Sequence, residues 1–426
     1  MECSENAVGA CAKADDLLSA GRTEDACAVL RPLLSAYPEN PIVHLLFART
    51  SAGLGDAHSA AIHFQRALML EPNLIGAHLH YAELLARRGD VQQALQHVEA
   101  GYKRVHTWES HYSGSADPLR VLQIGSAVAD GLTETEYILG QGWFQTTTIV
   151  VQYWQRGRGF PPHDIVFNSV ADPDRCGAAL DVAEWVLSQT SAPILNSPQA
   201  IRGTGRVSAA QRLAGIPNVI VPRIRRFRRR AVIAGQVDFA KEGFTFPLLL
   251  RQPGDHNGRN FRRVESPDAA AEAANALAGE DVFALEFVDT RRDGRFWKYR
   301  AMIVDGDVFP AHLAISNAWN VHYFSAQMNE NERAQEALFL EDMGAALGAP
   351  AMNALRVIAS RLGLDYAGID FGLNDRGEVV VFEANAAMTV FVPPESPQTH
   401  YRREAAFRIF SAARRMIEKR IAGSPR

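Results

Sequence analysis

The chain contains 426 residues, of which 47% are apolar and 22% are charged, and its formal net charge is −4. This composition is typical of a globular protein, excludes a generally basic nucleic-acid binder, and predicts about three domains of ~100–200 residues each. The sequence has no run of about 18 apolar residues, so we expect neither a membrane span nor a membrane partner.

The four cysteines give no sign of a disulfide framework or a zinc site. Cys3, Cys11, Cys27 and Cys176 show no CxxC pairing and no zinc-ligand spacing. The N-terminal segment MECSENAV has acidic residues where a secretory signal would have basic ones. We therefore expect the chain to work in a reducing cytoplasm.

The first hundred residues repeat with a period of 34 residues. Small residues and proline recur in register at this spacing: Ala14, Ala48 and Ala82; Gly21, Gly55 and Gly89; Ala26, Ala60 and Ala94; Pro38 and Pro72. The pattern resembles tetratricopeptide repeats, in which small residues lie where paired helices touch and glycine lies in the turn. It predicts an all-α array over residues 7–105. Such an array either docks a peptide or partner or caps the rest of the chain, and the sequence favours neither.

A different pattern of apolar and polar residues follows the polar link at residues 106–118. The segments LRVLQIGS, FQTTTIVVQYW and HDIVFNSV are short apolar or β-branched runs that end at turn residues. Between the last of them and later elements, DRCGAALDVAEWVLSQT reads as an amphipathic helix. Alternating strands and helices predict a small α/β domain with a partly parallel sheet over residues 115–200.

From residue 201 the pattern is mixed. The segments NVIVPRI, FPLLLRQP, VFALEFVD and KYRAMIVDGDVF predict strands. SAAQRLAGI, PDAAAEAANALAG after Ser266, and AMNALRVIASRLGL predict helices. We expect an α+β domain with antiparallel strands over residues 201–420.

An acidic hairpin lies near the end of that domain. If its NDRG turn is symmetric, Asp370 faces Val381, and the alternation of side chains puts Asp370, Glu383 and Asn385 on one face. Oxygen donors of this kind suit Mg²⁺, which usually bridges protein carboxylates to phosphate oxygens. The alternative is a solvated acidic face. The apolar run at residues 379–382 favours a buried strand, where unpaired charge is costly.

The order of four segments points to a family. Four segments follow one another along the chain. They are a basic segment at residues 194–223, the strand and glycine loop of FPLLLRQPGDHNGRN, the strands around FALEFVD and KYRAMIVDG, and the acidic hairpin. Over residues 120–420 this order resembles the ATP-grasp ligases, and is similar to glutathione synthetase and ribosomal-protein glutamate ligases. The resemblance implies a pre-ATP-grasp α/β domain followed by an α+β ATP-grasp domain, with ATP and Mg²⁺ as cofactors.

The resemblance implies two phosphate-binding arginines and a glycine loop. Arg206 and Arg251 stand where the family usually has lysines that neutralise nucleotide phosphates. Arginine keeps the charge and can bind phosphate bidentately, but its geometry differs from that of lysine. The segment from Gly254 to Gly258 matches the flexible loop that covers the phosphates, where glycine lets the backbone approach closely.

The nucleoside contacts follow from the same resemblance. The backbone from Leu285 to Val288 would lie along the edge of the adenine ring, and Glu286 would make the polar contact to the adenine. Asp289 is a candidate for binding the ribose. Without the resemblance, this segment reads as an ordinary strand.

The catalytic candidates are Arg300 and Arg251. Arg300 precedes its strand as the family's phosphate-directed arginine does, and Lys298 points to the same side at a spacing of two. Asp370, Glu383 and Asn385 match the family's magnesium ligands. In the family, the metal ions bridge the β- and γ-phosphates while phosphate passes to a substrate carboxylate. An amine then attacks the acylphosphate, so no protein nucleophile is needed.

The acceptor substrate is expected between the last two motifs. Polar and aromatic candidates there are His312, Asn317, Trp319, Asn320 and His322. The six arginines within residues 223–230 either steer an acidic substrate or form a solvated basic face.

These patterns together predict an ATP-dependent carboxylate–amine ligase, with ATP, a carboxylate and an amine as its partners. The repeats would recruit a peptide or protein substrate. Two alternatives stay open: a nucleotide-binding or catalytically silent ATP-grasp scaffold, suggested by the two arginines at lysine positions, and an ATP-grasp kinase. The substrates and the oligomeric state do not follow from the sequence.

Overall fold

The computed structural model describes residues 5–19, 22–103, 105–127, 132–155, 157–253, 260–323, 326–393, 396 and 400–423. The chain forms two compact units: Met1–Trp108 with Tyr153–Gln155, and Glu109–Gln152 with Arg156–Arg426. The first is helical and the second contains mixed α/β sheets, so this order of structural classes is confirmed. Within the described part of the chain, no helix has both the length and the apolar character needed to cross a bilayer.

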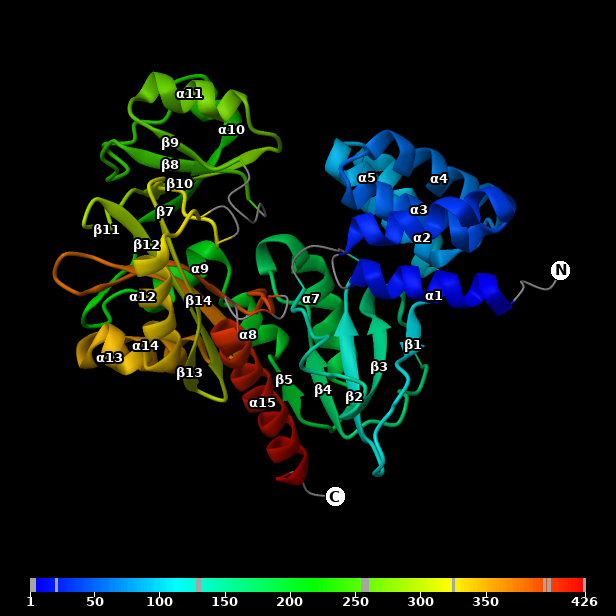
Figure 1. Ribbon diagram of the computed structural model, residues 1–426. Coiled ribbons are helices and arrows are strands. Elements are labelled where there is room, and N and C mark those ends of the chain that lie inside the picture. The colour runs from blue at the N-terminus through cyan, green and yellow to red at the C-terminus, as the bar shows by residue number, and fades with distance from the viewer. Residues whose placement is uncertain are drawn as a thin grey trace. The chain divides into compact units, whose positions relative to one another are not determined.

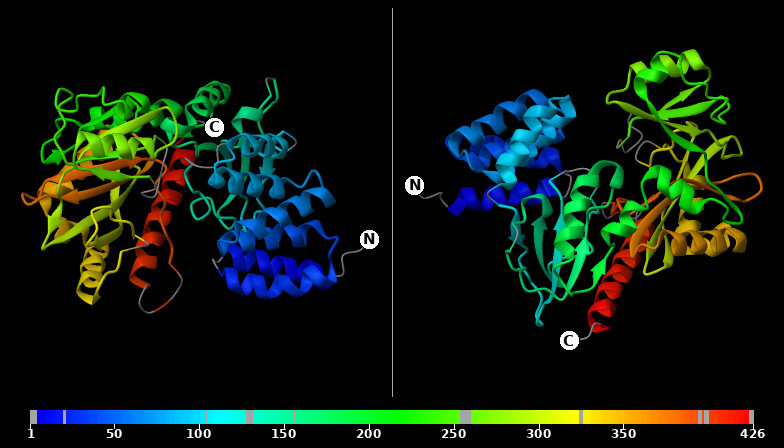
Figure 2. Two further views of the ribbon diagram at one scale, coloured as in Figure 1. Left: turned by 90° about the horizontal axis from the view of Figure 1, so that it is seen from above. Right: turned by 180° about the vertical axis from the view of Figure 1, so that it is seen from behind.

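Six helices build the first unit and stack one beside the next (Figures 1 and 2). They are α1 (Glu5–Ser19), α2 (Thr23–Ala36), α3 (Pro41–Gly53), α4 (Ala57–Leu70), α5 (Ile75–Arg88) and α6 (Val91–Tyr102). The alanines of the 34-residue pattern are all buried, which lets neighbouring helices approach closely. Gly55 and Gly89 have φ of +82° and +87° in the turns, where glycine costs least. Gly21 lies outside the described residues, and the tetratricopeptide assignment stays a prediction.

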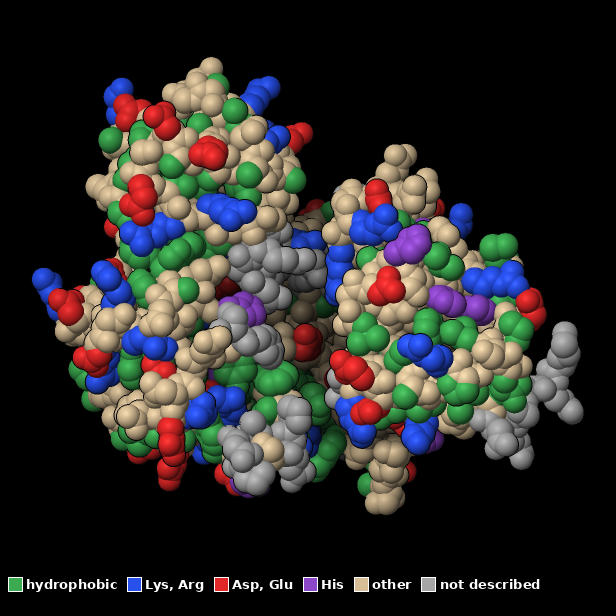
Figure 3. All heavy atoms as spheres, turned by 45° about the horizontal axis from the view of Figure 1, so that its top comes forward, with side chains coloured by type: hydrophobic (Ala, Val, Ile, Leu, Met, Phe, Trp, Pro, Cys, Tyr) green, Lys and Arg blue, Asp and Glu red, His purple; other side chains and the backbone are tan. Residues whose placement is uncertain are grey.

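Two histidine pairs recur at the period of the repeats. The Nδ1 atoms of His44 and His63 lie 2.9 Å apart, and those of His78 and His97 lie 2.8 Å apart. The Nε2 atom of His44 is 2.9 Å from the carbonyl oxygen of Pro38, and His78 makes the equivalent contact at 3.0 Å. Figure 3 shows histidine side chains on the surface of the helical unit. Each pair ties two helices of a repeat to the loop that precedes them.

A five-stranded sheet in the order β1-β3-β2-β4-β5 comes next; β1 begins in the first unit, and the other strands belong to the second. Its strands are β1 (Thr107–Glu109), β2 (Leu119–Gly125), β3 (Phe144–Val150), β4 (Ile165–Asn168) and β5 (Ile194–Leu195). Strands β2 to β5 pair in parallel, as the alternating pattern predicts. The short 3-10 helix η1 (Val151–Tyr153) follows β3, and α7 (Pro173–Leu187) follows β4, with its N-terminus capped by Asp172.

A four-stranded antiparallel sheet follows, in the order β7-β10-β8-β9. Its strands are β7 (Ile224–Arg228), β8 (Leu248–Arg251), β9 (Arg262–Val264) and β10 (Asp281–Glu286). Helices α10 (Arg229–Ile233) and α11 (Pro267–Asn275) cover it, and Ser266 caps α11 as the sequence predicts. Leu248, Leu250 and Val282 pack into the apolar core under these helices.

The last sheet has six strands in the order β11-β12-β14-β15-β6, with β13 paired to β12. Its strands are β6 (Val219–Ile220), β11 (Arg291–Arg292), β12 (Arg295–Val304), β13 (Asp307–Ser316), β14 (Tyr366–Leu373) and β15 (Val379–Asn385). The helices around it are α8 (Pro198–Arg202), α9 (Arg206–Leu213), α12 (Glu330–Glu341), α13 (Met343–Leu347), α14 (Ala349–Leu362) and α15 (His400–Ala422). Figure 2 shows α15 running along this part of the unit.

The structure corrects the expected register of the acidic hairpin. Asp370 lies opposite Glu383, not Val381, and the register shifts between Asp370 and Phe371. The cause is one extra residue in β15, Phe382, which has no partner in the ladder and so forms a β-bulge. Beyond the bulge, Asn385 pairs with Gly368, two residues from Asp370. The three oxygen donors therefore share a face, although the reasoning from a symmetric turn gave the wrong partner.

Candidate functional site

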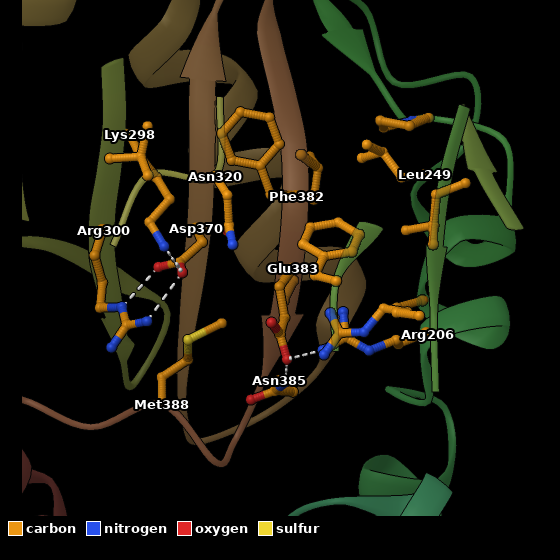
Figure 4. A pocket seen from close by; sticks show the side chains of 18 of the residues that line it. Arg206, Leu249, Lys298, Arg300, Asn320, Asp370, Phe382, Glu383, Asn385 and Met388 are labelled. Atoms are coloured by element: carbon orange, nitrogen blue, oxygen red, sulfur yellow. Dashed lines mark hydrogen bonds and ion pairs between the residues drawn. The ribbon is translucent and has the colours of Figure 1, made fainter. Parts of the chain in front are cut away.

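The four-stranded and six-stranded sheets enclose a cavity of about 870 Å³ within the second unit (Figure 4). This volume is within the usual range for small-molecule sites. Strands β8, β10, β12, β13, β14 and β15 contribute its walls, together with α9. The site residues predicted from the sequence that line it are Arg206, Arg251, Leu285, Glu286, Val288, Lys298, Arg300, Asp370, Glu383 and Asn385. Residues spread over 180 positions of sequence thus meet in one cavity.

Asp370 lies on the buried strand β14 and is held by two cations. The Nε and Nη2 atoms of Arg300 donate to its two oxygens at 2.6 and 2.9 Å, and Lys298 Nζ lies 3.2 Å from Oδ2. Burial alone would raise the pKa of Asp370, but the charges of Arg300 and Lys298 outweigh burial and hold that pKa far below its usual value. Arg300 and Lys298 therefore favour the ionised form of Asp370.

Glu383 has its own arginine. Arg206 Nη2 donates to Glu383 Oε1 at 2.8 Å, and Asn385 Nδ2 donates to the same oxygen at 2.8 Å. Arg206 is the first residue of α9, and its backbone N–H donates to Asp174 at 2.9 Å. Figure 4 shows the Arg206–Glu383 pair beside the Arg300–Asp370 pair. The geometry thus places Arg300 and Lys298 against Asp370, and Arg206 against Glu383, the two carboxylates of the candidate metal set.

The donor set fits a hard divalent cation that also binds phosphate. Asp370 and Glu383 are direct partners across the hairpin, and Asn385 follows two residues along β15. No group of three or more His, Cys, Asp and Glu side chains suited to a metal occurs among the described residues. Two carboxylates and an amide leave most coordination positions to other oxygens, which is how Mg²⁺ is usually bound beside phosphates. The residues present therefore fit magnesium held jointly with a nucleotide.

Arg251 lies at the end of β8, at the opposite wall of the cavity. Its side chain is buried, and its guanidinium lies over the ring of Phe261 with 5.2 Å to the ring centroid. The planar guanidinium stacks on an aromatic face better than the lysine ammonium does, which gives a physical reason for arginine at this position. Gly254 and Gly258, which follow Arg251, lie outside the described residues.

The predicted nucleoside contacts lie at the end of β10. Leu285, Glu286 and Val288 line the cavity. The Glu286 carboxylate accepts a hydrogen bond from the backbone N–H of Arg223 at 3.1 Å. Asp289 is not among the described lining residues, and its carboxylate pairs with Arg291 at 2.6 Å. The adenine and ribose assignments stay predictions.

The sequence interpretation missed the apolar wall of the cavity. Leu249 of β8 and Phe382 of β15 face the cavity from opposite sheets (Figure 4), and Val221 and Ile224 also line it. Such surfaces suit the flat face of a ring. A usable signal existed for Phe382, which ends the apolar run directly before Glu383, and for Leu249, which lies two residues before Arg251.

Four of the five acceptor candidates line the cavity, and Asn317 does not. His312 stacks on Tyr323 with ring centroids 4.3 Å apart, and its buried Nδ1 atom has no hydrogen-bond partner among the described residues. Burial, and then the charge of Arg300, hold the pKa of His312 well below its usual value. Both effects favour the neutral ring. Trp319 packs edge-on against Phe261, with 5.1 Å between ring centroids.

Thr133 and Glu134 also line the cavity and carry no sequence signal. They come from the loop between β2 and β3, far from the other motifs. Thr133 Oγ1 donates to the carbonyl of Ala386 at 2.9 Å, just beyond β15. This contact ties the five-stranded sheet region to the end of the acidic hairpin.

The run of arginines lies on β7 and the start of α10. Arg225 pairs with Glu242 at 2.5 Å and Arg228 with Glu280 at 3.0 Å. Both arginines are largely exposed, so these pairs are worth little stability. The geometry agrees with a solvated basic face with local ion pairs.

No protein-family model matches the chain. Over 78 residues, 18% of this chain and 18% of the relative, it is 38% identical to the probable biofilm formation methyltransferase WspC of Pseudomonas putida, so it spans less than a fifth of that relative. Similar solved structures include the VanG D-Ala:D-Ser ligase of Enterococcus faecalis, at 12% identity and a TM-score of 0.40 over 69% of this chain and 100% of that one. A RimK domain ATP-grasp protein of Sphaerobacter thermophilus is 18% identical, with a TM-score of 0.40. The match covers 71% of this chain and 100% of that one. Likeness at this level decides nothing about function, which rests on the site.

Proposed function

We propose that the chain is an ATP-dependent carboxylate–amine ligase of the ATP-grasp type. One observation carries the proposal: a single cavity holds Asp370, Glu383 and Asn385 beside four cationic side chains, with an apolar wall between the sheets. The cations are Arg206, Arg251, Lys298 and Arg300. An ATP molecule presents the complementary chemistry, namely an apolar ring face and a chain of phosphates accompanied by a divalent cation.

The roles of the side chains follow from their positions. Leu249 and Phe382 would sandwich the adenine ring, and Glu286 at the end of β10 would make its polar contact. Arg206 and Arg251 would neutralise phosphate oxygens, and Arg300 would stabilise the negative charge that develops on the transferred phosphoryl group. Asp370, Glu383 and Asn385 would hold Mg²⁺, which supplies further charge stabilisation at the phosphates.

The chemistry needs no nucleophile from the protein. The substrate carboxylate attacks the terminal phosphorus of ATP, the phosphoryl group moves to it, and ADP leaves. The amine then attacks the carbonyl carbon of the acylphosphate, the carbon–oxygen bond to phosphate breaks, and an amide, phosphate and a proton result. Trp319, Asn320 and His322 border the cavity where the substrates would lie. The helical unit would recruit a peptide or protein that carries one of them.

A catalytically silent nucleotide-binding scaffold is the second candidate. The observation that favours it is arginine at both expected lysine positions, with Arg206 engaged by Glu383. A kinase that phosphorylates a hydroxyl would use the same nucleotide site.

Calorimetry with ATP and Mg²⁺, followed by product analysis with mixtures of carboxylates and amines, separates these functions. The ligase proposal predicts nucleotide binding and the formation of ADP, phosphate and an amide. Binding without turnover for every substrate mixture would support the scaffold, and a stable phosphorylated product would support the kinase. No binding would contradict the ligase and the kinase and would favour an empty ATP-grasp scaffold.

A further inference from the structure

Both carboxylates of the candidate metal set are already neutralised by the cations that the nucleotide phosphates need. Arg300 grips Asp370 with two hydrogen bonds of 2.6 and 2.9 Å, and Arg206 binds Glu383 at 2.8 Å. The side chain of Asp370 is only 6% exposed, and that of Arg300 is 19% exposed. Salt screens such pairs weakly, so their strength persists at physiological ionic strength.

The binding of a metal-free nucleotide in this cavity is unfavourable. Its phosphates must compete with Asp370 and Glu383 for the same guanidinium groups. Each arginine that turns toward phosphate also withdraws its positive charge from a buried carboxylate, which then lies beside further negative charge, and breaking a buried ion pair is strongly destabilising. Lys298, 3.2 Å from Asp370 Oδ2, offsets this cost only in part. The free nucleotide therefore gains little from the cationic side chains of the cavity.

The metal complex of the nucleotide meets a favourable site, because it brings a cation for the carboxylates. The arginines can then turn to the phosphates while every charge stays paired. The anchoring of the arginines suits such an exchange. The backbone of Arg206 is fixed by Asp174 at the start of α9, and Arg300 keeps a third hydrogen bond to the carbonyl of Thr389 at 3.1 Å.

We propose that Asp370 and Glu383 are specificity-determining residues, which make the cavity select the divalent-metal complex of a nucleoside triphosphate over the free nucleotide. They do so by occupying Arg300 and Arg206 until a metal ion replaces these arginines. This inference rests on the proposed function, and it extends that function with an exchange of ion-pair partners. It also carries an unusual consequence: removing a metal-ligand charge improves the binding of metal-free nucleotide.

The test measures the affinity of the full chain for a non-hydrolysable ATP analogue by calorimetry, once with excess EDTA and once with Mg²⁺. The variants are Asp370→Asn and Glu383→Gln, which keep the shape of the side chain and remove its charge. Glu383 is 21% exposed, so Glu383→Gln folds even if the deeply buried Asp370→Asn does not. The matched control is Asp375→Asn, which removes one charge from the exposed turn of the same hairpin.

In EDTA, we expect each site variant to bind the analogue about tenfold or more tightly than the unmodified chain, a size typical of close charge pairs. With Mg²⁺, the same variants lose the advantage and bind more weakly than the unmodified chain. Asp375→Asn behaves as the unmodified chain under both conditions. Circular dichroism confirms that each variant is folded.

The outcomes separate this inference from the proposed function. If the unmodified chain binds the Mg²⁺ complex but a folded Glu383→Gln variant shows unchanged or weaker affinity in EDTA, the exchange is wrong and the nucleotide site stands. If the unmodified chain does not bind the Mg²⁺ complex, the proposed function is wrong and this inference falls with it.

Discussion

Asp370 and Glu383 lie directly opposite each other on β14 and β15, and each carboxylate is paired with a different arginine. The bulge at Phe382 creates this relationship. If the ladder continued from the Phe371–Val381 pair without a bulge, Asp370 would face Phe382, and the side chains of the two carboxylates would point to opposite faces of the sheet. One inserted residue thus brings together the two charges on which the proposed site depends.

The first prediction concerns the proposed metal ligands Glu383 and Asn385. Glu383→Ala and Asn385→Ala should lower Mg²⁺-dependent nucleotide turnover by about 100-fold or more, because they remove ligands of the ion that stabilises phosphoryl transfer. Steady-state ADP formation measures the effect, and Asp375→Ala on the exposed turn is the control. Undiminished turnover in folded variants would show that the metal lies elsewhere.

The second prediction concerns the arginine on β8. Arg251→Met should weaken nucleotide binding by about 10- to 100-fold through loss of one charge at the phosphates, whereas Arg251→Lys should retain most of the affinity. Arg262→Met, on the exposed face of the neighbouring strand β9, should leave the affinity unchanged. Equal affinities for Arg251→Met and the unmodified chain would remove Arg251 from the phosphate site.

The third prediction concerns the pH dependence of the helical unit. The Pro38 carbonyl can only accept, so Nε2 of His44 carries hydrogen, and Nδ1 of His63 lies 2.9 Å from Nδ1 of His44. Burial, and then the charge of the partner, lower the pKa values of His63 and His97. As the pH drops, these histidines are protonated in the unfolded state before they are protonated in the folded state. The stability of the folded state therefore falls as the pH drops through about 6.5 toward the lower folded-state pKa values.

Calorimetric unfolding at pH 7.5 and 5.5 measures this effect. The unmodified chain should lose stability between these values, and the variant His63→Gln with His97→Gln should lose less. His58→Gln, on the exposed side of α4, is the control. An identical pH dependence in the double variant would show that the histidine pairs do not contribute.

The fourth prediction concerns a buried ion pair between α12 and α15. Glu336 of α12 is fully buried and accepts from Arg402 Nε at 2.9 Å and from the Tyr401 hydroxyl at 2.9 Å. Arg402→Met should destabilise the chain by about 3–5 kcal/mol, because it leaves a buried carboxylate without its cation. Arg415→Met, on the exposed side of α15, should change stability by less than about 0.5 kcal/mol. Chemical denaturation measures both, and equal effects would contradict the assignment.

Local patterns in the sequence explain much of the fold. The 34-residue period predicts the helices of the first unit, because close helix packing demands small residues at fixed spacing. The alternation of side chains along β15 correctly puts Glu383 and Asn385 on one face, whereas Asp370 joins them only through the bulge at Phe382. Turn and capping residues such as Ser266 locate the start of a helix. All of these signals act over a few residues or repeat regularly.

The parts of the site that escaped prediction depend on contacts between distant segments. Thr133 is held at the cavity by its hydrogen bond to the carbonyl of Ala386. No sequence pattern within either segment predicts that contact. The bulge at Phe382 changes the register without changing the order of residue types. The pairing of Arg206 with Glu383 joins residues 177 positions apart. Such contacts arise only when the sheets assemble.

A crystal structure with Mg²⁺ and a non-hydrolysable ATP analogue tests the central claim most directly. We predict the nucleotide between Leu249 and Phe382, Mg²⁺ on Asp370 and Glu383, and Arg206 and Arg300 turned to phosphate oxygens. A nucleotide bound outside this cavity, with both arginine–carboxylate pairs unchanged, would contradict the account.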